Sequence, residues 1–461
     1  MEFRNILQNL PEVRAPIEKR LSFNKKFKWT LIILASFFVL SNIPLYGLSR
    51  NALERFEFLS IILGTDFGSI ISLGIGPIVM ASIILQLLVG SQILKIDTKT
   101  EEGRKYFQGL QKLLVFFFII FEALIYVLMG GLEALPGFTL ILVFQLILGG
   151  LAIMFMDEVV SKWGFGSGIS LFIIAGVGWR LFAGLFQFIG INGENCLLNF
   201  YSTPCAGQIW IIIQSILKGD PTQLFNASAV IIITISIFLL VVWAQSLKVE
   251  VPLSYERLRG YGIRWPLSFF YSSVIPVILV SALAANIQLF AGLIENYLGR
   301  PTLLGGFSAG QPISGFAYWL SSTNIVNALI TGSFQSSFFL QAITHTIFYM
   351  ALSAVFAVFW VKTSGMDASS QARNIMSSGL QLPGFRKDER VLESILNRYI
   401  MPLTIMGGIA VGLLASVANI LGALTGGTSI LLAVMITYQL YQNIAQQHVA
   451  DMHPILKKLT G

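Results

Sequence analysis

Ten long apolar stretches run through the chain, and they constrain its fold more than any other feature. Each approaches the roughly 20 residues that an α-helix needs to cross the hydrocarbon of a bilayer. Only 11% of the 461 residues are charged, which is less than half of the roughly one quarter typical of soluble domains. The period-two alternation of a membrane β-barrel does not stand out. We therefore expect an all-α polytopic membrane protein.

The predicted spans alternate with polar connections. By residue number they are 29–48, 70–89, 107–130, 138–156, 169–189, 227–243, 269–289, 338–360, 400–420 and 429–444. The first 28 residues are polar and charged and lack the apolar core of a signal peptide, so we expect the first span itself to direct insertion. Within them, Phe3, Ile6, Leu7 and Leu10 fall at helical spacing. This segment is predicted to be a short amphipathic helix, either on the membrane surface or packed on the protein.

Positive charge is distributed unevenly over the connections. When alternate connections are assigned to opposite sides, 24 of the 30 lysines and arginines fall on one side, together with both termini. Cytoplasmic segments carry the excess of Lys and Arg in membrane proteins. We therefore expect both termini in the cytoplasm.

The second span contains a break. Its sequence around Gly74, Gly76 and Pro77 reads SLGIGPIVMASIILQ, from Ser72 to Gln86. Glycine weakens a helix, and proline removes a backbone donor and clashes with the preceding turn. Pro276 interrupts the seventh span in the same way. Paired interruptions at corresponding positions indicate a site between two repeats.

Signatures of catalysis are weak. Gly164 to Gly168 reads GFGSG, which lacks the lysine and the spacing of a phosphate-binding loop. No Ser-His-Asp or metal-binding constellation stands out, so we expect neither an enzyme nor a cofactor. Asp157 and Glu158 end the fourth span and are expected to be solvated. Cys196 and Cys205 lie in one polar loop, where they form either a disulfide or two unrelated thiols.

Two connections on the positive side carry clustered arginines. One reads KVEVPLSYERLRGYGIRW from Lys248, and the other contains GFRKDERVLESILNR and extends from Lys362 to Arg398. They are either ordinary positively charged loops or a basic docking face. The second is longer than a connection between two helices needs, which favours a docking face for an acidic partner such as a membrane surface or RNA.

Several longer motifs together resemble the SecY family, the main subunit of the protein-conducting channel, in its archaeal and eukaryotic branch. They occur in order along nearly the whole chain: LGIGPIVMASIILQLLVGS (73–91), FQGLQKLL (107–114), DEVVSKWGFGSGISLFIIAGV (157–177), KVEVPLSYERLRG (248–260), IPVILVSALAANIQL (275–289), GFRKDE (384–389) and NILGALTGGTSILL (419–432). The resemblance implies ten transmembrane helices in two pseudo-symmetric inverted halves of five.

On that basis the chain divides into consecutive regions. They are a cytoplasmic N-terminal segment (1–28), a first half (29–190), an external loop (191–225), a second half (226–448) with cytoplasmic loops at 246–267 and 362–398, and a cytoplasmic tail (449–461).

The resemblance also implies an hourglass pore that a ring of aliphatic side chains constricts. The expected ring residues are Ile75, Val79, Ile169, Ile173, Ile278 and Leu432. Aliphatic walls offer ions no hydrogen bonds, and a narrow apolar constriction dewets. A plug at about 56–69, including Gly64, Thr65, Asp66 and Gly68, would seal the outer funnel. Gly74, Gly76 and Pro77 would form its hinge.

A lateral gate is expected between the second and third spans and the seventh and eighth spans. Glu122 and Asn286 match the family's polar gate cluster, whose third position is Met80 here instead of a polar residue. Either the cluster loses that member in this chain, or Ser82 or Gln86 replaces it. Arg257, Arg259, Arg386 and Lys387 fall in the loops that dock the ribosome in the family.

The resemblance predicts the central pore-forming subunit of a Sec translocation channel. It would pass secretory polypeptides across the cell membrane and release transmembrane segments sideways. Expected partners are a gamma (SecE-like) subunit, a beta subunit, the ribosome, and translocating polypeptides with their signal sequences, with no small-molecule substrate. The alternative is a secondary transporter with inverted repeats, which needs a specific polar or ionic site at mid-membrane. A membrane scaffold would not require the paired helix breaks.

Overall fold

The computed structural model describes most of the chain. The described residues are 10–18, 21–53, 64–96, 100–190, 194–198, 200, 203–255, 262–272, 274–308, 310–377, 380–381 and 388–452. The amphipathic residues Phe3, Ile6 and Leu7, the first part of the expected plug and the four expected ribosome-docking residues lie outside them.

Within the described ranges, ten helices correspond to the ten predicted spans, five in each half. The first half contains α2 (Phe23–Ser41), α4 (Gly76–Gly90), α5 (Glu101–Leu128), α6 (Thr139–Trp163) and α7 (Gly168–Phe186). The second half contains α9 (Pro221–Ser246), α10 (Ile275–Leu298), α13 (Ser336–Thr363), α15 (Glu389–Leu421) and α16 (Gly427–Met452).

Seven of these helices are long and apolar enough to cross a membrane by length and composition alone, namely α5, α6, α7, α9, α10, α13 and α15. Helix α4 has only 15 residues, or about 22 Å, against the roughly 30 Å of hydrocarbon. The turns that precede it supply the remaining depth.

The two halves repeat the same packing order. In the first half α4 packs on α5, α5 on α6 and α6 on α7, and in the second half α10 packs on α13, α13 on α15 and α15 on α16. Helix α2 contacts α6 and α7, as α9 contacts α15 and α16. Because each half has five spans, corresponding helices cross in opposite directions. The predicted pair of inverted halves is confirmed.

The halves meet along two seams. On one side α4 packs against both α10 and α13, and on the other side α7 packs against α16. One large hydrophobic cluster joins residues of both halves across these contacts. The pore expected from the sequence would run between the two seams.

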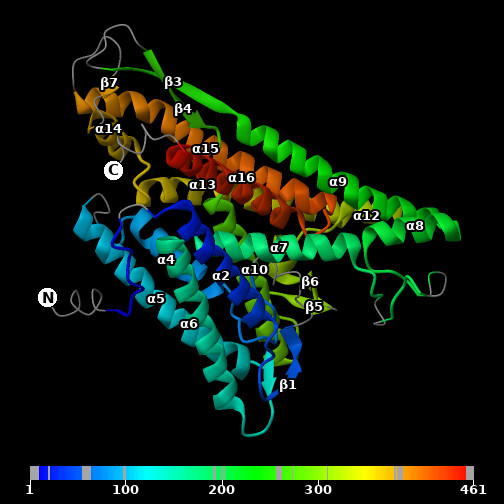
Figure 1. The fold of residues 1–461 in the computed structure, drawn as a ribbon. Helices are drawn as coiled ribbons and strands as arrows, with labels where there is room; N and C mark the ends of the chain where they lie inside the picture. Colours follow the sequence, from blue (N-terminus) through cyan, green and yellow to red (C-terminus); the bar gives the residue numbers. More distant parts are fainter. Residues whose placement is uncertain are drawn as a thin grey trace.

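Short elements cover the two ends of the bundle. Those on one side are β1 (Leu48–Asn51), β2 (Leu132–Ala134), α8 (Gln208–Lys218), β5 (Gly306–Ser308), β6 (Gln311–Ser314), α11 (Gly315–Leu320) and α12 (Ile325–Ile330). Those on the other side are β3 (Lys248–Tyr255), β4 (Gly262–Ser268), α14 (Ala368–Ser377) and β7 (Leu380–Gln381). Figure 1 shows α14 and β7 at one end of the helices and α8, β5 and β6 toward the other.

Several predicted boundaries differ from the structure. The first span was expected to reach Leu48, but α2 ends at Ser41, because Pro44 disfavours helix at the residue before it. The seventh span was expected to start at Phe269, but α10 starts only at Ile275, with Pro276 in its first turn, where no donor is needed. It then continues to Leu298.

The connections are also more ordered than expected. The region 191–225, expected to be a loop, contains α8 and the start of α9. The two loops expected at 246–267 and 362–398 contain a three-stranded sheet in the order β4-β3-β7, in addition to α14. Strand β3 pairs with β4 from Lys248↔Ser268 to Ser254↔Gly262, and Tyr255 at its end pairs with Leu380 of β7.

Candidate functional site

The break in the second span is a run of turns followed by a short helix. Gly74 has φ +55°, the left-handed region that a side chain disfavours, and its N–H donates to the Ile71 carbonyl. Helix α4 then begins at Gly76, with Pro77 in its first turn. The predicted interruption is therefore present, and these residues change the chain from turns to helix.

The residues expected to constrict the pore come together in the core. Ile75, Val79, Ile173, Ile278 and Leu432 are at most 5% exposed, and Ile169 is half-buried against the same hydrophobic cluster. They come from α4 with its N-cap, α7, α10 and α16, which belong to both halves. This aliphatic set stands between the two seams.

Helix α7 is anchored at its start by a half-buried carboxylate. The N–H of Ile169 donates to Asp157 Oδ1 at 3.0 Å, and Ser170 N–H donates to the hydroxyl of Ser167, the N-cap. These acceptors satisfy orphan donors of the first helical turn. The prediction that Asp157 is solvated is wrong, because the turn at Gly164–Ser167 folds α7 back against the end of α6.

Glu158 is also not a free solvated carboxylate. Its two oxygens accept from Lys112 Nζ on α5 and Lys162 Nζ on α6, each at 3.0 Å. Lys162 also pairs with Glu12 of the N-terminal segment. This network joins the N-terminal segment, α5 and α6.

The described end of the expected plug sits directly above the aliphatic set. A Cβ placed on Gly64 would lie 3.8 Å from both Ile75 Cγ2 and Phe172 Cβ. The hydroxyl of Thr65 donates to the Ile71 carbonyl at 2.7 Å, and Asn51 Nδ2 donates to the Phe67 carbonyl at 2.9 Å. Hydrogen bonds therefore hold this segment against Asn51 of β1 and the turn that precedes α4.

A serine-rich turn closes the same segment. Gly68 N–H donates to the Ser72 hydroxyl at 2.9 Å, and the Ser69 hydroxyl donates to the Asp66 carbonyl at 2.7 Å. Both serines are buried. The backbone N–H and C=O groups of a turn need hydrogen-bond partners where water is scarce. These serines supply such partners, so an irregular segment can pack between the helices.

A cavity of about 170 Å³ lies beside the aliphatic set, near the starts of α7 and α10. Its apolar lining includes Ile174, Ile278 and Ile436, and its polar lining includes Ser170, Gln439 and Asn443. The lining belongs to α7, α10, α16 and the ends of their flanking turns. The aliphatic set therefore has this cavity on one side and the packed segment at 64–68 on the other.

The residues of the expected gate cluster lie along α4, α5 and α10, and no hydrogen bond joins any two of them. Ser82, on α4, accepts from Gln111 Nε2 of α5 at 2.8 Å. Asn286 Nδ2 donates to its own helix at the Ala282 carbonyl at 2.9 Å. Met80 is half-buried against the main core and offers no hydrogen bond. Gln111 was not anticipated from the sequence.

Glu122 is the most constrained member of this group. It is fully buried, and neither of its carboxyl oxygens has a hydrogen-bond partner among the described residues. One oxygen would lie 3.1 Å from a Cβ on Gly76, so the carboxyl group lies against the first turn of α4. The side-chain carbonyls of Gln86 and Asn286 are likewise buried without a partner. Buried polar groups without a partner among the described residues therefore lie on α4, α5 and α10, the helices of the expected gate.

The seam is closed along its length in this structure. At one end a Cβ on Gly90 would lie 2.5 Å from the Phe359 ring of α13, so only glycine permits this approach of α4 to α13. At the other end Asn296 Nδ2 of α10 donates to the Gly130 carbonyl after α5 at 2.9 Å. Neither contact was anticipated from the sequence, because each joins residues more than 150 positions apart.

The open question of the two cysteines is resolved. Cys196 and Cys205 form a disulfide with a Cα–Cα distance of 5.3 Å. Both are buried in the loop between α7 and α8, and the amide of Gln214 on α8 donates to the Thr203 carbonyl at 2.8 Å. The disulfide and this amide fasten the loop that joins the two halves.

No group of three or more His, Cys, Asp or Glu side chains in the described ranges could hold a metal ion. Ten apolar helices in two similar halves, with a buried aliphatic set contributed by both, define a multi-pass membrane protein of the channel or transporter class.

Comparison with known proteins identifies the family. The SecY family model matches residues 69–441, and a model described as the plug domain of Sec61p matches residues 37–68. The chain is 44% identical to the protein translocase subunit SecY of Methanothermobacter thermautotrophicus, covering 100% of this chain and 98% of the relative. It is 39% identical to the subunit of Methanocaldococcus jannaschii, with 98% of each covered. The chain belongs to the SecY family.

Solved structures agree with this assignment. The fold matches a structure described as that of a protein conducting channel, with a TM-score of 0.81, 38% identity, and 97% of this chain and 98% of the other covered. It also matches Sec61 in a canine ribosome-channel complex from the endoplasmic reticulum, with a TM-score of 0.78, 37% identity, and 97% and 98% covered.

Proposed function

We propose that this chain is the central pore-forming subunit of a Sec-type protein-conducting channel, and not an enzyme. The observation that carries the proposal is the aliphatic set of Ile75, Val79, Ile173, Ile278 and Leu432 between the two halves, with the Gly64–Gly68 segment packed above it. A polypeptide of arbitrary sequence requires walls without directional preference, and dispersion contacts to aliphatic side chains have none.

The resting state would be sealed in two ways. The aliphatic ring excludes ions because it offers them no replacement for their hydration shell. The plug segment adds a second seal, and Gly74, Gly76 and Pro77 form the hinge about which it leaves. The turns at 67–75 support this role, since a continuous helix would move only as a whole.

Transmembrane segments would leave sideways between α4 and α5 on one side and α10 and α13 on the other. The buried, unpartnered oxygens of Glu122 and Asn286 support this assignment. Such groups destabilise the closed seam, so part of the free energy of opening is offset when they reach water or the backbone of an entering segment. Met80 contributes no such group in this chain.

A secondary transporter fits the site less well. A transporter needs a specific polar or ionic site at mid-membrane, whereas the residues expected to line the pore here are aliphatic. The buried carboxyl group of Glu122 on α5 lies against Gly76 at the start of α4 and has no hydrogen-bond partner among the described residues.

The cytoplasmic sheet would dock the ribosome. Arg257 and Arg259 follow β3 along the chain, and Arg386 and Lys387 follow β7. Because Tyr255 pairs with Leu380, the two segments depart from one sheet, which supports a shared docking face. The remaining partners would be a gamma (SecE-like) and a beta membrane subunit, in the cell membrane, with both termini cytoplasmic.

Transport by the purified complex tests this proposal. The chain, with the small subunits that copurify, is reconstituted into vesicles and supplied with ribosomes that carry a nascent secretory chain. We expect the nascent chain to become protected from protease, and Arg386→Glu combined with Arg257→Glu to weaken ribosome binding most at low salt. Vesicles that concentrate a small solute but never protect a nascent chain would contradict the channel and support the transporter.

A further inference from the structure

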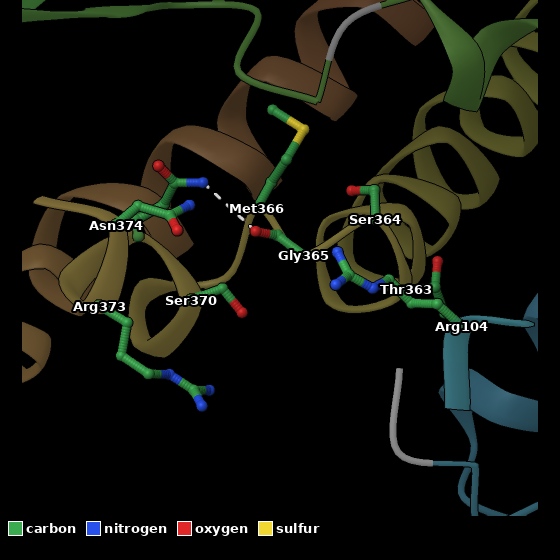
Figure 2. Close-up of a pocket in the computed structure, with 9 residues that line it drawn as sticks. Arg104, Thr363, Ser364, Gly365, Met366, Ser370, Arg373 and Asn374 are labelled. Atoms are coloured by element: carbon green, nitrogen blue, oxygen red, sulfur yellow. Dashed lines mark hydrogen bonds between the residues drawn. The ribbon is translucent and has the colours of Figure 1, made fainter. Parts of the chain in front are cut away.

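A polar cavity of about 490 Å³ opens on the cytoplasmic side of the closed seam. Its lining comes from the start of α5, the turn after α13, and α14. Figure 2 shows Arg104 on one wall and Arg373 on the other, with Ser364, Gly365 and Ser370 between them. Neither the expected pore nor the expected docking residues take part in this cavity.

The charge of the cavity is positive and incompletely neutralised. The Arg104 side chain makes no hydrogen bond or ion pair with any part of the chain that the structure describes. Arg373 contacts Glu389 through Nε at 3.6 Å and Ser369 through a terminal nitrogen at 3.4 Å, which leaves most of its guanidinium donors open. The neighbouring Asp367 accepts from the Ser370 hydroxyl. The guanidinium groups of two arginines and several hydroxyl groups therefore line one cavity.

This combination of groups suits a phosphate. Guanidinium groups bind phosphate oxygens through paired, charge-assisted hydrogen bonds, and they do so better than lysine, which acts as a point charge. The hydroxyl of Ser364 and the amide of Asn374 lie on the same lining. A carboxylate-bearing small molecule would satisfy fewer of these donors.

The cavity also lies at the depth of lipid head groups. Helix α5 exposes Phe117 and Phe121, and α13 exposes Ile347 and Val355, as expected for faces in contact with acyl chains. At 1.5 Å per residue, Ser364 lies about 13 Å beyond Val355 along the axis of α13. The phosphate of a lipid whose chains lie on these two faces would reach the cavity.

We propose that this cavity binds a phosphate group, and specifically that of an anionic phospholipid in the cytoplasmic leaflet. Arg104 belongs to the first half and Arg373 to the second, so one phosphate held by both arginines bridges the seam. Such a lipid would stabilise the closed seam at its cytoplasmic end. This last step rests on the proposed lateral gate, whereas the binding itself does not.

Lipid binding to the detergent-purified complex tests the site. Native mass spectrometry counts the phosphatidylglycerol molecules that the wild-type complex retains, and the complexes carrying Arg104→Gln, Arg373→Gln and Lys105→Gln are compared with it. Each arginine change is expected to lower the retention of one lipid about fivefold, since a basic side chain near the surface contributes about that much. Lys105→Gln removes the same charge from the next position of α5, outside the cavity, and is expected to change retention less than twofold. Equal retention in the wild type and Arg104→Gln would overturn the site.

A second arm identifies the source of the phosphate. The complex is mixed with phosphatidylcholine and millimolar inorganic phosphate in place of phosphatidylglycerol. We expect no retained anion in this arm. Retained phosphate that Arg104→Gln abolishes, without retention of phosphatidylglycerol in the first arm, would overturn the lipid assignment.

Crosslinking across the seam separates the bridging step from the proposed function. In a Gly90→Cys, Phe359→Cys variant, phosphatidylglycerol in the vesicles should speed disulfide formation, and adding Arg104→Gln should remove the difference. Retention of the lipid without any effect on crosslinking would refute the bridge and leave the site intact. Failure of nascent-chain protection, with the lipid still retained, would refute the proposed function alone.

Discussion

Arg180 on α7 lies with a terminal nitrogen 3.6 Å from a carboxylate oxygen of Asp66, in the segment that packs against Ile75 of the aliphatic set. The two side chains are 21% and 55% exposed, so the pair is not buried in the core. Helix α7 also carries Ile169 and Ile173. The same helix thus contributes to the proposed ring and holds the proposed plug.

Loss of this ion pair should loosen the plug. An exposed ion pair contributes about 0.5 kcal/mol, which corresponds to roughly a twofold change in the equilibrium between a seated and a displaced plug. Arg180→Gln is therefore expected to raise the resting ion conductance of reconstituted channels about twofold, measured in planar bilayers. The exchanged pair Asp66→Arg, Arg180→Asp should return the conductance toward the wild type. A double variant that leaks as much as the single one would show that the pair has no such role.

The seam can be pinned by a disulfide across it. A Cβ on Gly90 would lie 3.1 Å from the Cβ of Phe359, close to the separation that a disulfide needs once the phenyl ring is removed. The Gly90→Cys, Phe359→Cys variant should crosslink under mild oxidation and lose insertion of transmembrane segments. Reduction should restore insertion, measured by alkali-resistant incorporation into vesicles.

The single variants are the controls for this experiment. Phe359→Cys alone carries the same cavity but cannot bridge the seam, so oxidation should leave it active, whereas Gly90→Cys alone presses against the Phe359 ring and shows the effect of that clash. The wild type tests whether reductant acts through the native Cys196–Cys205 disulfide. Normal insertion by a fully crosslinked double variant would contradict an exit between α4 and α13.

Asp157 should stabilise α7 as a helix cap. Asp157→Ala removes the acceptor of the Ile169 N–H, a loss that costs about 1 kcal/mol at helix N-termini. Asp157→Asn keeps an oxygen at the same place and is the matched control. We expect a lower midpoint of thermal unfolding in detergent for the alanine variant and a nearly unchanged midpoint for asparagine. Equal midpoints for alanine and the wild type would mean that the cap contributes nothing.

The sequence predicted the spans and the break well because both depend on local chemistry. Apolar length specifies a crossing helix, and Gly74 and Pro77 interrupt it wherever they stand. The resemblance to a known family added which spans face one another. Burial of Ile75, Val79 and Leu432 in one cluster agrees with that arrangement, although an ordinary core residue would be buried in the same way.

The contacts that close the seam between the two halves could not be predicted from local patterns. Gly90 against Phe359, and Asn296 on the Gly130 carbonyl, join residues that neither spacing nor hydropathy relates. Asp157 was misjudged for the same reason, since its partner at Ile169 becomes a neighbour only after the chain turns back. Helix α8 was missed because its apolar residues lie between polar connections and are too few to span a membrane.

The aliphatic constriction should act as the ion barrier of the resting channel. Val79→Thr replaces a methyl group by a hydroxyl at nearly constant shape, so it wets the ring without opening a cavity. We expect a several-fold rise in the resting conductance of reconstituted bilayers, with the protein still folded. Val411→Thr on α15 is the matched control, because Val411 is as deeply buried as Val79, each being 2% exposed, but lies away from the ring. The control should pay the same desolvation cost for a buried hydroxyl and leave conductance unchanged. If both variants raise the resting conductance equally, the barrier is a property of general packing. If neither variant raises it and Ile278→Asn also leaves it unchanged, the ring lies elsewhere.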